Sequence, residues 1–174
     1  MTKERLEKIL FGEELLVYAI LDGASIPDLP MKLFEMSPPN YCLFRGELEP
    51  DMASVAPYLV LLQPKDPFTD WLLKDCFGKH WAVFLQSRHS LKDLRGHFRG
   101  LVTVFNEDGN PMVFRYYDPR VMTKYLPSCT DEELSEFFGG VKKFFAELPA
   151  KGSLMSYAIE NGKLKESEFK KEEK

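Results

Sequence analysis

Blocks of apolar residues alternate with polar and charged blocks along the chain, and their lengths predict strands and helices in turn. Residues 15–21, LLVYAIL, form a continuous apolar run of strand length, which is typical of a strand covered on both faces of a sheet. Residues 1–14 are charged and amphipathic, which favours a helix before this strand. Further strands are predicted for residues 41–44, 58–63 and 81–87.

Three local signals mark the starts of further helices. Residues 66–67 are Asp-Pro, an N-cap side chain followed by proline at the first helical position. Residues 90–93 and 130–133 have the capping-box spacing, in which a serine or threonine precedes an acidic residue by three positions. Helices are therefore predicted for residues 66–77, 91–99 and 130–138.

Two hairpins are predicted in the second half of the chain. Residues 101–117 are rich in β-forming residues and surround the turn EDGN, which is typical of an antiparallel hairpin. Residues 153–169 surround an Asn-Gly pair, the usual two-residue turn of a hairpin. The segment between helix and hairpin, residues 141–148, fits either a strand or a helix.

Together these elements predict an α/β fold with a mixed central sheet, helices packed around it, and a small C-terminal appendage of one helix and a β-hairpin. We expect residues 1–128 to form the core domain. Residues 129–174 would then hold the appendage, which ends in a charged, frayed tail at residues 170–174.

Charge and cysteine content narrow the functions that such a domain could have. The net charge is −4 and the folded part contains no lysine–arginine block, so the electrostatic attraction that dominates nucleic-acid binding is missing. No apolar run approaches the ~20 residues that cross a bilayer, and the charged start does not resemble a secretory signal. The three cysteines, Cys42, Cys76 and Cys129, are odd in number, widely spaced and without a CxxC pair. This pattern is typical of reduced thiols in cytosolic proteins and not of a disulfide framework. We therefore expect a cytoplasmic protein that binds neither membranes nor nucleic acid.

Motifs for catalysis and cofactor binding are missing from the sequence. It contains no phosphate-binding glycine loop, no GxSxG turn and no histidine pair with metal-site spacing. We expect no cofactor, no metal and no enzymatic activity. A hydrolase that uses Cys76 or Cys129 with a histidine stays open as an alternative, and it would require a pocket that stabilises a thiolate.

The segment VFRYYDPRV lies at a predicted junction between a strand and a helix. Asp118 could cap the new helix and also accept a bidentate bond from Arg115 or Arg120, which flank it. We interpret this arrangement as a structural clamp. If the strand continues through Tyr116 and Tyr117, these side chains point to opposite faces, so one of them should be at the surface.

The combination of LDGA at residues 21–24 with FRYYDPR at residues 114–120 resembles a family of type VI secretion effector adaptors, once described only as a domain of unknown function. The resemblance covers about residues 15–141. It implies a chaperone that binds a secreted effector protein, encoded beside it, and hands it to the valine-glycine-repeat spike protein, without enzymatic activity. The matching positions include Asp22, Gly23, Arg115, Asp118 and Pro119.

Candidate partner-binding residues come from the junction and from the C-terminal hairpin. They are Tyr117, Arg120, Met155, Tyr157 and Ile159. By strand alternation the last three share one face, which either covers the nearby phenylalanines of the core or receives the effector. A small acidic protein of this kind could also be an immunity protein that neutralises a neighbouring toxin.

Overall fold

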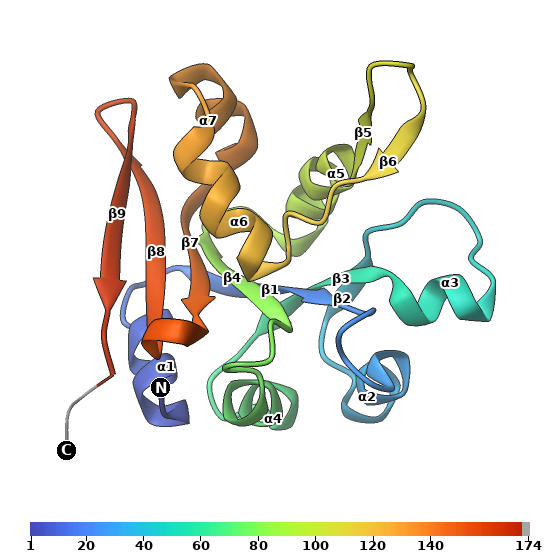
Figure 1. Cartoon of the computed structure of the whole chain (residues 1–174). Helices are drawn as coiled ribbons and strands as arrows, with labels where there is room; N and C mark the ends of the chain where they lie inside the picture. The colour runs from blue at the N-terminus through green and yellow to red at the C-terminus, as the bar shows by residue number, and fades with distance from the viewer. Residues whose placement is uncertain (172–174) are drawn as a thin grey trace.

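A seven-stranded antiparallel sheet organises the molecule (Figure 1). The structure is a computed structural model that describes residues 1–171. Every strand ladder in this part of the chain is antiparallel. In spatial order the strands are β2 (Asn40–Cys42), β3 (Pro57–Leu62), β1 (Leu16–Asp22), β4 (Ala82–Ser87), β7 (Val141–Leu148), β8 (Ser153–Glu160) and β9 (Lys163–Phe169).

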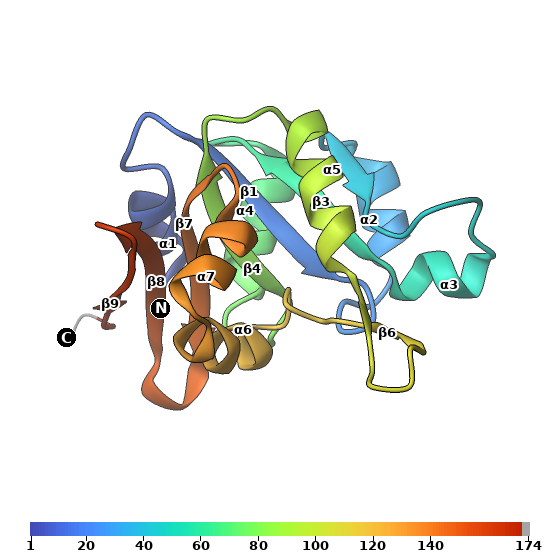
Figure 2. The same cartoon turned by 90° about the horizontal axis from the view of Figure 1, so that it is seen from above.

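Helices cover both faces of this sheet, so the molecule has three layers. One face carries α1 (Lys3–Leu10), α2 (Leu29–Met36) and α4 (Pro67–Asp75). The other carries α5 (Leu91–Leu101), α6 (Pro119–Tyr125) and α7 (Asp131–Phe138), and in the view from above α5 and the pair α6–α7 lie on either side of β1 and β4 (Figure 2). The short elements are α3 (Pro50–Val55) and the 3-10 turns Leu126–Ser128 and Pro149–Lys151.

A second, two-stranded hairpin projects from the face that carries α5. It consists of β5 (Thr103–Phe105) and β6 (Pro111–Val113), and it pairs with no strand of the main sheet among the described residues. Figure 1 shows it standing away from the layers, beyond the end of α5.

The two helical layers explain why β1 is apolar at consecutive positions. Tyr18 and Ile20 belong to the core under α5, α6 and α7, whereas Val17, Ala19 and Leu21 belong to the core on the opposite face. Every residue of β1 after Leu16 is buried because helices cover both faces of the strand, so the alternation of polar and apolar residues disappears.

The predicted α/β class, with a central sheet surrounded by helices, is confirmed. The predicted helix starts are also present: Asp66 accepts hydrogen bonds from the backbone N–H groups of Phe68 and Thr69. Thr130 and Glu133 form a complete capping box at the start of α7. Residues 141–148, for which two structures were open, form the strand β7.

The C-terminal hairpin lies differently from the expected appendage, because β8 pairs with β7 and extends the main sheet. Phe144 of β7 and Tyr157 of β8 are direct cross-strand partners in the core cluster that also contains Tyr18. That cluster therefore draws on residues from both sides of residue 128. The predicted tail at residues 170–174 lies, from residue 172 onwards, outside the described part of the chain.

The expectation that either Tyr116 or Tyr117 lies at the surface is wrong. Strand β6 ends at Val113, and the backbone then turns, with the Asp118 N–H donating to the Arg115 carbonyl. Strand alternation therefore does not apply to Tyr116 and Tyr117, and both side chains are buried. Tyr116 donates its hydroxyl to the carbonyl of Phe98, 3.1 Å away.

Tyr157, predicted to bind a partner, is also buried, so its side chain offers no docking surface. Met155 and Ile159 are partly buried and pack against the same core cluster. The face of the C-terminal hairpin that they share covers the core phenylalanines. The physical reason is that β7 leaves one edge free, and pairing with β8 satisfies that edge and shields Phe144 at the same time.

We expect Tyr157→Ala to lower the free energy of unfolding by about 3–5 kcal/mol, the range for truncation of a large buried aromatic side chain. Glu166→Ala changes the exposed cross-strand partner of Tyr157 in β9 and should stay within about 0.5 kcal/mol of the wild type. Urea titration followed by tryptophan fluorescence measures both. A Tyr157→Ala protein as stable as the wild type would contradict the assigned burial.

Candidate functional site

The two motifs of the sequence meet at a buried carboxylate. Asp22 ends β1, is fully buried, and accepts hydrogen bonds from the Ala24 N–H (3.2 Å) and the Ser25 hydroxyl (2.7 Å). The guanidinium of Arg115 donates to the same carboxylate and pairs with its charge. Residues 93 positions apart in sequence are thereby joined.

Gly23 is required here by a close approach of two backbones. A Cβ atom on Gly23 would lie 2.3 Å from the carbonyl oxygen of Ala56, and the Gly23 N–H donates to that same oxygen at 3.2 Å. The turn after β1 therefore packs directly on the chain entering β3. Gly23 is not among the glycines with positive φ, so the close approach, and not a left-handed backbone, excludes a larger residue here.

Asp118 forms a second ion pair, with Arg120 and not with Arg115. Its carboxylate accepts from the Arg120 backbone N–H at 2.8 Å and from the Arg120 side chain at 2.7–3.2 Å, so it caps α6 as predicted and binds the guanidinium with both oxygens. Burial alone would raise the pKa of Asp118, but the hydrogen bonds and charge of Arg120 outweigh it and hold that pKa below its usual value. Pro119 occupies the first turn of α6.

Tyr117, a predicted binding residue, lies inside this junction. Burial, followed by the charge of Asp22, raises the pKa of Tyr117 to about 12. The side chain is 2% exposed, which removes it from the candidate contacts. Of the predicted binding residues at the junction, Arg120 alone lies largely in solvent, with 58% of its side chain exposed.

The alternative of a hydrolase that uses Cys76 or Cys129 requires surroundings that stabilise a thiolate. Cys76 is buried, and desolvation raises its pKa far above the usual value, with the charge of Glu147 acting in the same direction. Burial also raises the pKa of the Cys129 thiol, which donates to the Tyr125 carbonyl. Both environments favour the protonated thiol, whereas a nucleophile needs the thiolate.

Glu147 is a third buried carboxylate, after Asp22 and Asp118, and no motif in the sequence indicated it. It accepts hydrogen bonds from the backbone N–H groups of Gly78 and His80, and the Nδ1 atom of His80 lies 3.1 Å from it. Burial raises the pKa of Glu147 in spite of the two N–H donors. Its role is to hold the loop between α4 and β4. Within residues 1–171, no group of three or more His, Cys, Asp and Glu side chains could hold a metal ion.

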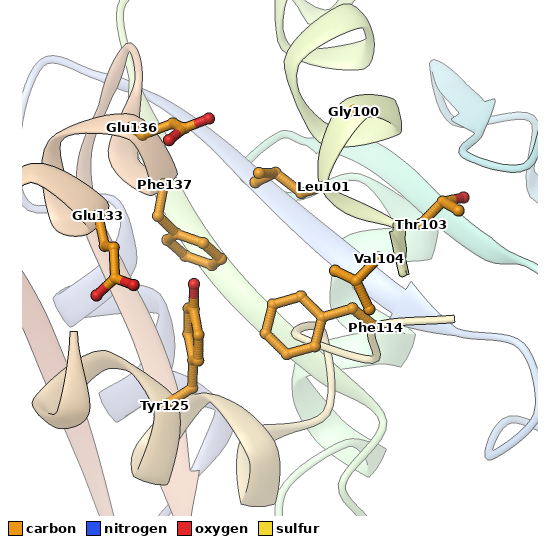
Figure 3. A pocket seen from close by; sticks show the side chains of 9 residues that line it. All are labelled: Gly100, Leu101, Thr103, Val104, Phe114, Tyr125, Glu133, Glu136 and Phe137. Atoms are coloured by element: carbon orange, nitrogen blue, oxygen red, sulfur yellow. The ribbon is translucent and has the colours of Figure 1, made fainter. Parts of the chain in front are cut away.

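A hollow of about 530 Å³ opens between α5 with the start of β5 on one side and α6 with α7 on the other (Figure 3). The aromatic rings of Phe114, Tyr125 and Phe137 line it, with Leu101 and Val104 beside them. Glu133 and Glu136 of α7 also line it (Figure 3). Its volume lies within the ~300–1,000 Å³ of typical binding pockets.

The hairpin beside this hollow exposes apolar side chains on both of its faces. Val104 lines the hollow, and its cross-strand partner Met112 shares the same face, so the apolar surface continues beyond the hollow. Phe105 is 68% exposed, and Val113 is also exposed on this hairpin. We call Val104, Phe105, Met112 and Val113, together with the hollow, the apolar docking face.

The sequence predicts this hairpin but not its exposure. The available signal was the run LVTVF and PMVF, which has apolar residues at positions that face both sides. Such a run is also the pattern of a strand buried on both faces, as in β1. Only the separation of the hairpin from the main sheet distinguishes the two cases.

Comparisons with known proteins give one match. A family model described as Domain of unknown function (DUF4123) matches residues 17–136, which run from β1 into α7 and include Asp22, Arg115 and the whole hairpin. No curated protein and no solved structure matches the chain. Among residues 1–171, no helix has the length and apolar character that a bilayer crossing requires.

The two ion pairs should differ in their contribution to stability. Arg115→Ala leaves the buried Asp22 carboxylate without its cation and should lower the free energy of unfolding by about 1.5–3 kcal/mol, the value of hydrogen bonds to a charged group. Arg120→Ala removes an exposed partner and should cost about 0–1 kcal/mol.

Denaturant midpoints of both variants test the difference, with Asp22→Asn and the double variant Asp22→Asn/Arg115→Ala completing a mutant cycle. Two results would contradict this prediction. In one, the changes in the free energy of unfolding are additive in the cycle; in the other, Arg115→Ala and Arg120→Ala lower that free energy equally. Either would show that the Asp22–Arg115 pair does not stabilise the fold more than the exposed pair.

Proposed function

We propose that this chain, which belongs to the DUF4123 family, is an adaptor that binds a secreted effector and helps to load it onto the spike of a type VI secretion system. The proposal makes it a protein-binding module that works in the cytoplasm before secretion. Its partners would be the effector and the valine-glycine-repeat spike protein, as implied by the resemblance that the motifs at residues 21–24 and 114–120 carry.

The observation that carries the proposal is the apolar docking face. A two-stranded hairpin is marginally stable by itself and usually packs its apolar face on something. In β5 and β6 every residue is exposed, and the sheet pairs with no third strand among the described residues. Contiguous exposed apolar surface on a soluble domain is typical of a protein–protein contact.

The chemistry around the hollow supports binding over catalysis. Its lining combines aromatic and aliphatic side chains with two carboxylates of α7, and it contains neither a cysteine nor a histidine. The protonated thiols of Cys76 and Cys129 lack the activation that a nucleophile requires. Aromatic residues are also the type that concentrates binding energy at interfaces.

Phe105→Ser tests the proposal, with Phe34→Ser as the matched control. Both phenylalanines are exposed, by 68% and 80%, but Phe34 belongs to α2 on the opposite face of the sheet. Phe105→Ser should weaken binding of the effector encoded beside this chain by about thirtyfold, the equivalent of a hot-spot loss of ~2 kcal/mol. The melting temperature should not change, because Phe105 supports no core contact.

Calorimetric titration of the purified effector into each variant gives the affinities. Phe34→Ser should bind like the wild type. The proposal would be refuted if the effector bound none of the proteins, and the docking face would be wrong if only Phe34→Ser lost affinity. Binding to the isolated toxic domain alone would favour an immunity protein instead.

A further inference from the structure

The floor of the hollow is a group of aromatic rings that offers a specific apolar seat. The rings of Phe114 and Tyr125 are 4.8 Å apart between centroids and nearly perpendicular, and those of Tyr125 and Phe137 are 5.4 Å apart. Phe114 is also tied to the base of the hairpin, since its N–H donates to the Val102 carbonyl at 2.8 Å. The seat is therefore preformed.

The rim of this seat is acidic. Glu133 and Glu136 are three residues apart on α7 and both line the hollow (Figure 3). Glu133 accepts a hydrogen bond from the Thr130 N–H, and no cation among residues 1–171 pairs with either glutamate. Burial, a hydrogen bond with Cys129 and the charges of these two glutamates raise the pKa of Tyr125 to about 12.

The basic residues of the opposite wall are held elsewhere. On α5 the Arg99 guanidinium donates to the carbonyl groups of Cys42 and Phe44, and the Arg95 guanidinium stacks on the ring of Tyr41. Both contacts direct these side chains towards β2, away from the hollow. The two residues at the tip of the hairpin that carry charge, Glu107 and Asp108, are acidic as well.

We propose that the hollow binds a basic amphipathic segment of the effector, in which apolar side chains enter the aromatic seat and neighbouring lysines or arginines meet Glu133 and Glu136. This inference rests on the proposed function and specifies its partner chemistry. An apolar seat excludes water, so the adjacent carboxylates select for a cationic flank and disfavour an acidic one.

A pair of synthetic helical peptides tests this selectivity without the effector. Both carry the same leucine and phenylalanine stripe, and the flanking positions are lysine in one and glutamate in the other. The lysine peptide should bind at least tenfold more tightly by fluorescence anisotropy. Glu136→Lys should abolish this preference, whereas Glu132→Lys, an identical charge change on α7 outside the hollow, should preserve it.

Filling the hollow provides a test that does not depend on charge. A Cβ at Gly100, which lines the hollow, or at Gly96, one turn earlier on α5, would meet no atom within 4 Å. Leucine at either position also raises helix propensity, so neither change should unfold the protein. Gly100→Leu should weaken binding of the lysine peptide at least tenfold, and Gly96→Leu should leave it unchanged.

Several outcomes would overturn the inference: equal binding of the two peptides, no binding of either, or equal effects of Gly100→Leu and Gly96→Leu. A dimer in sedimentation that Gly100→Leu dissociates would assign the hollow to a second copy of the chain instead. The proposed function is tested separately: it fails if the effector does not bind to the wild-type protein. Effector binding that Glu136→Lys and Gly100→Leu leave intact would refute the inference and retain the adaptor.

Discussion

The buried carboxylate of Asp22 is the constraint on which the candidate site depends. Its cation comes from Arg115, which lies between Phe114 in the aromatic seat and Tyr116 in the core. An unpaired charge at this depth would be costly, so the segment from β6 to α6 is held against the end of β1. Because the hairpin precedes this segment and α6 follows it, one ion pair anchors the end of the hairpin and the start of α6.

The two helical layers differ in how completely they cover the sheet. The layer with α1, α2 and α4 closes one face of the sheet over the second core cluster. On the other face, α5 and the pair α6–α7 lie apart (Figure 2), and Phe114 and Tyr125 between them are only partly covered. The exposed hairpin then extends this uncovered surface. The sheet thus supports an exposed apolar surface, which the proposed function assigns to a second protein.

How far the sequence predicts this arrangement depends on the distance between the interacting residues. The caps at Asp66 and Thr130 act within three positions, so local spacing was sufficient to predict them. Sequence proximity leaves Arg115 and Arg120 as equal partners for Asp118, and it cannot reveal that the carboxylate bound by Arg115 lies 93 positions away. Tyr157 was misplaced for the same reason, since alternation defines two faces of a strand but not which neighbour covers each. The exposure of Phe105 likewise depends on the hairpin standing clear of the sheet.

The central claim is that a partner completes the face formed by the β5–β6 hairpin and the hollow. Hydrogen–deuterium exchange of the protein, alone and bound to the effector encoded beside it, tests this claim directly. We expect slower exchange in the bound state for residues 101–114 and 131–137, with no change in α2. Unchanged exchange in those two segments, together with protection of α2 or of the β8–β9 hairpin, would contradict the account.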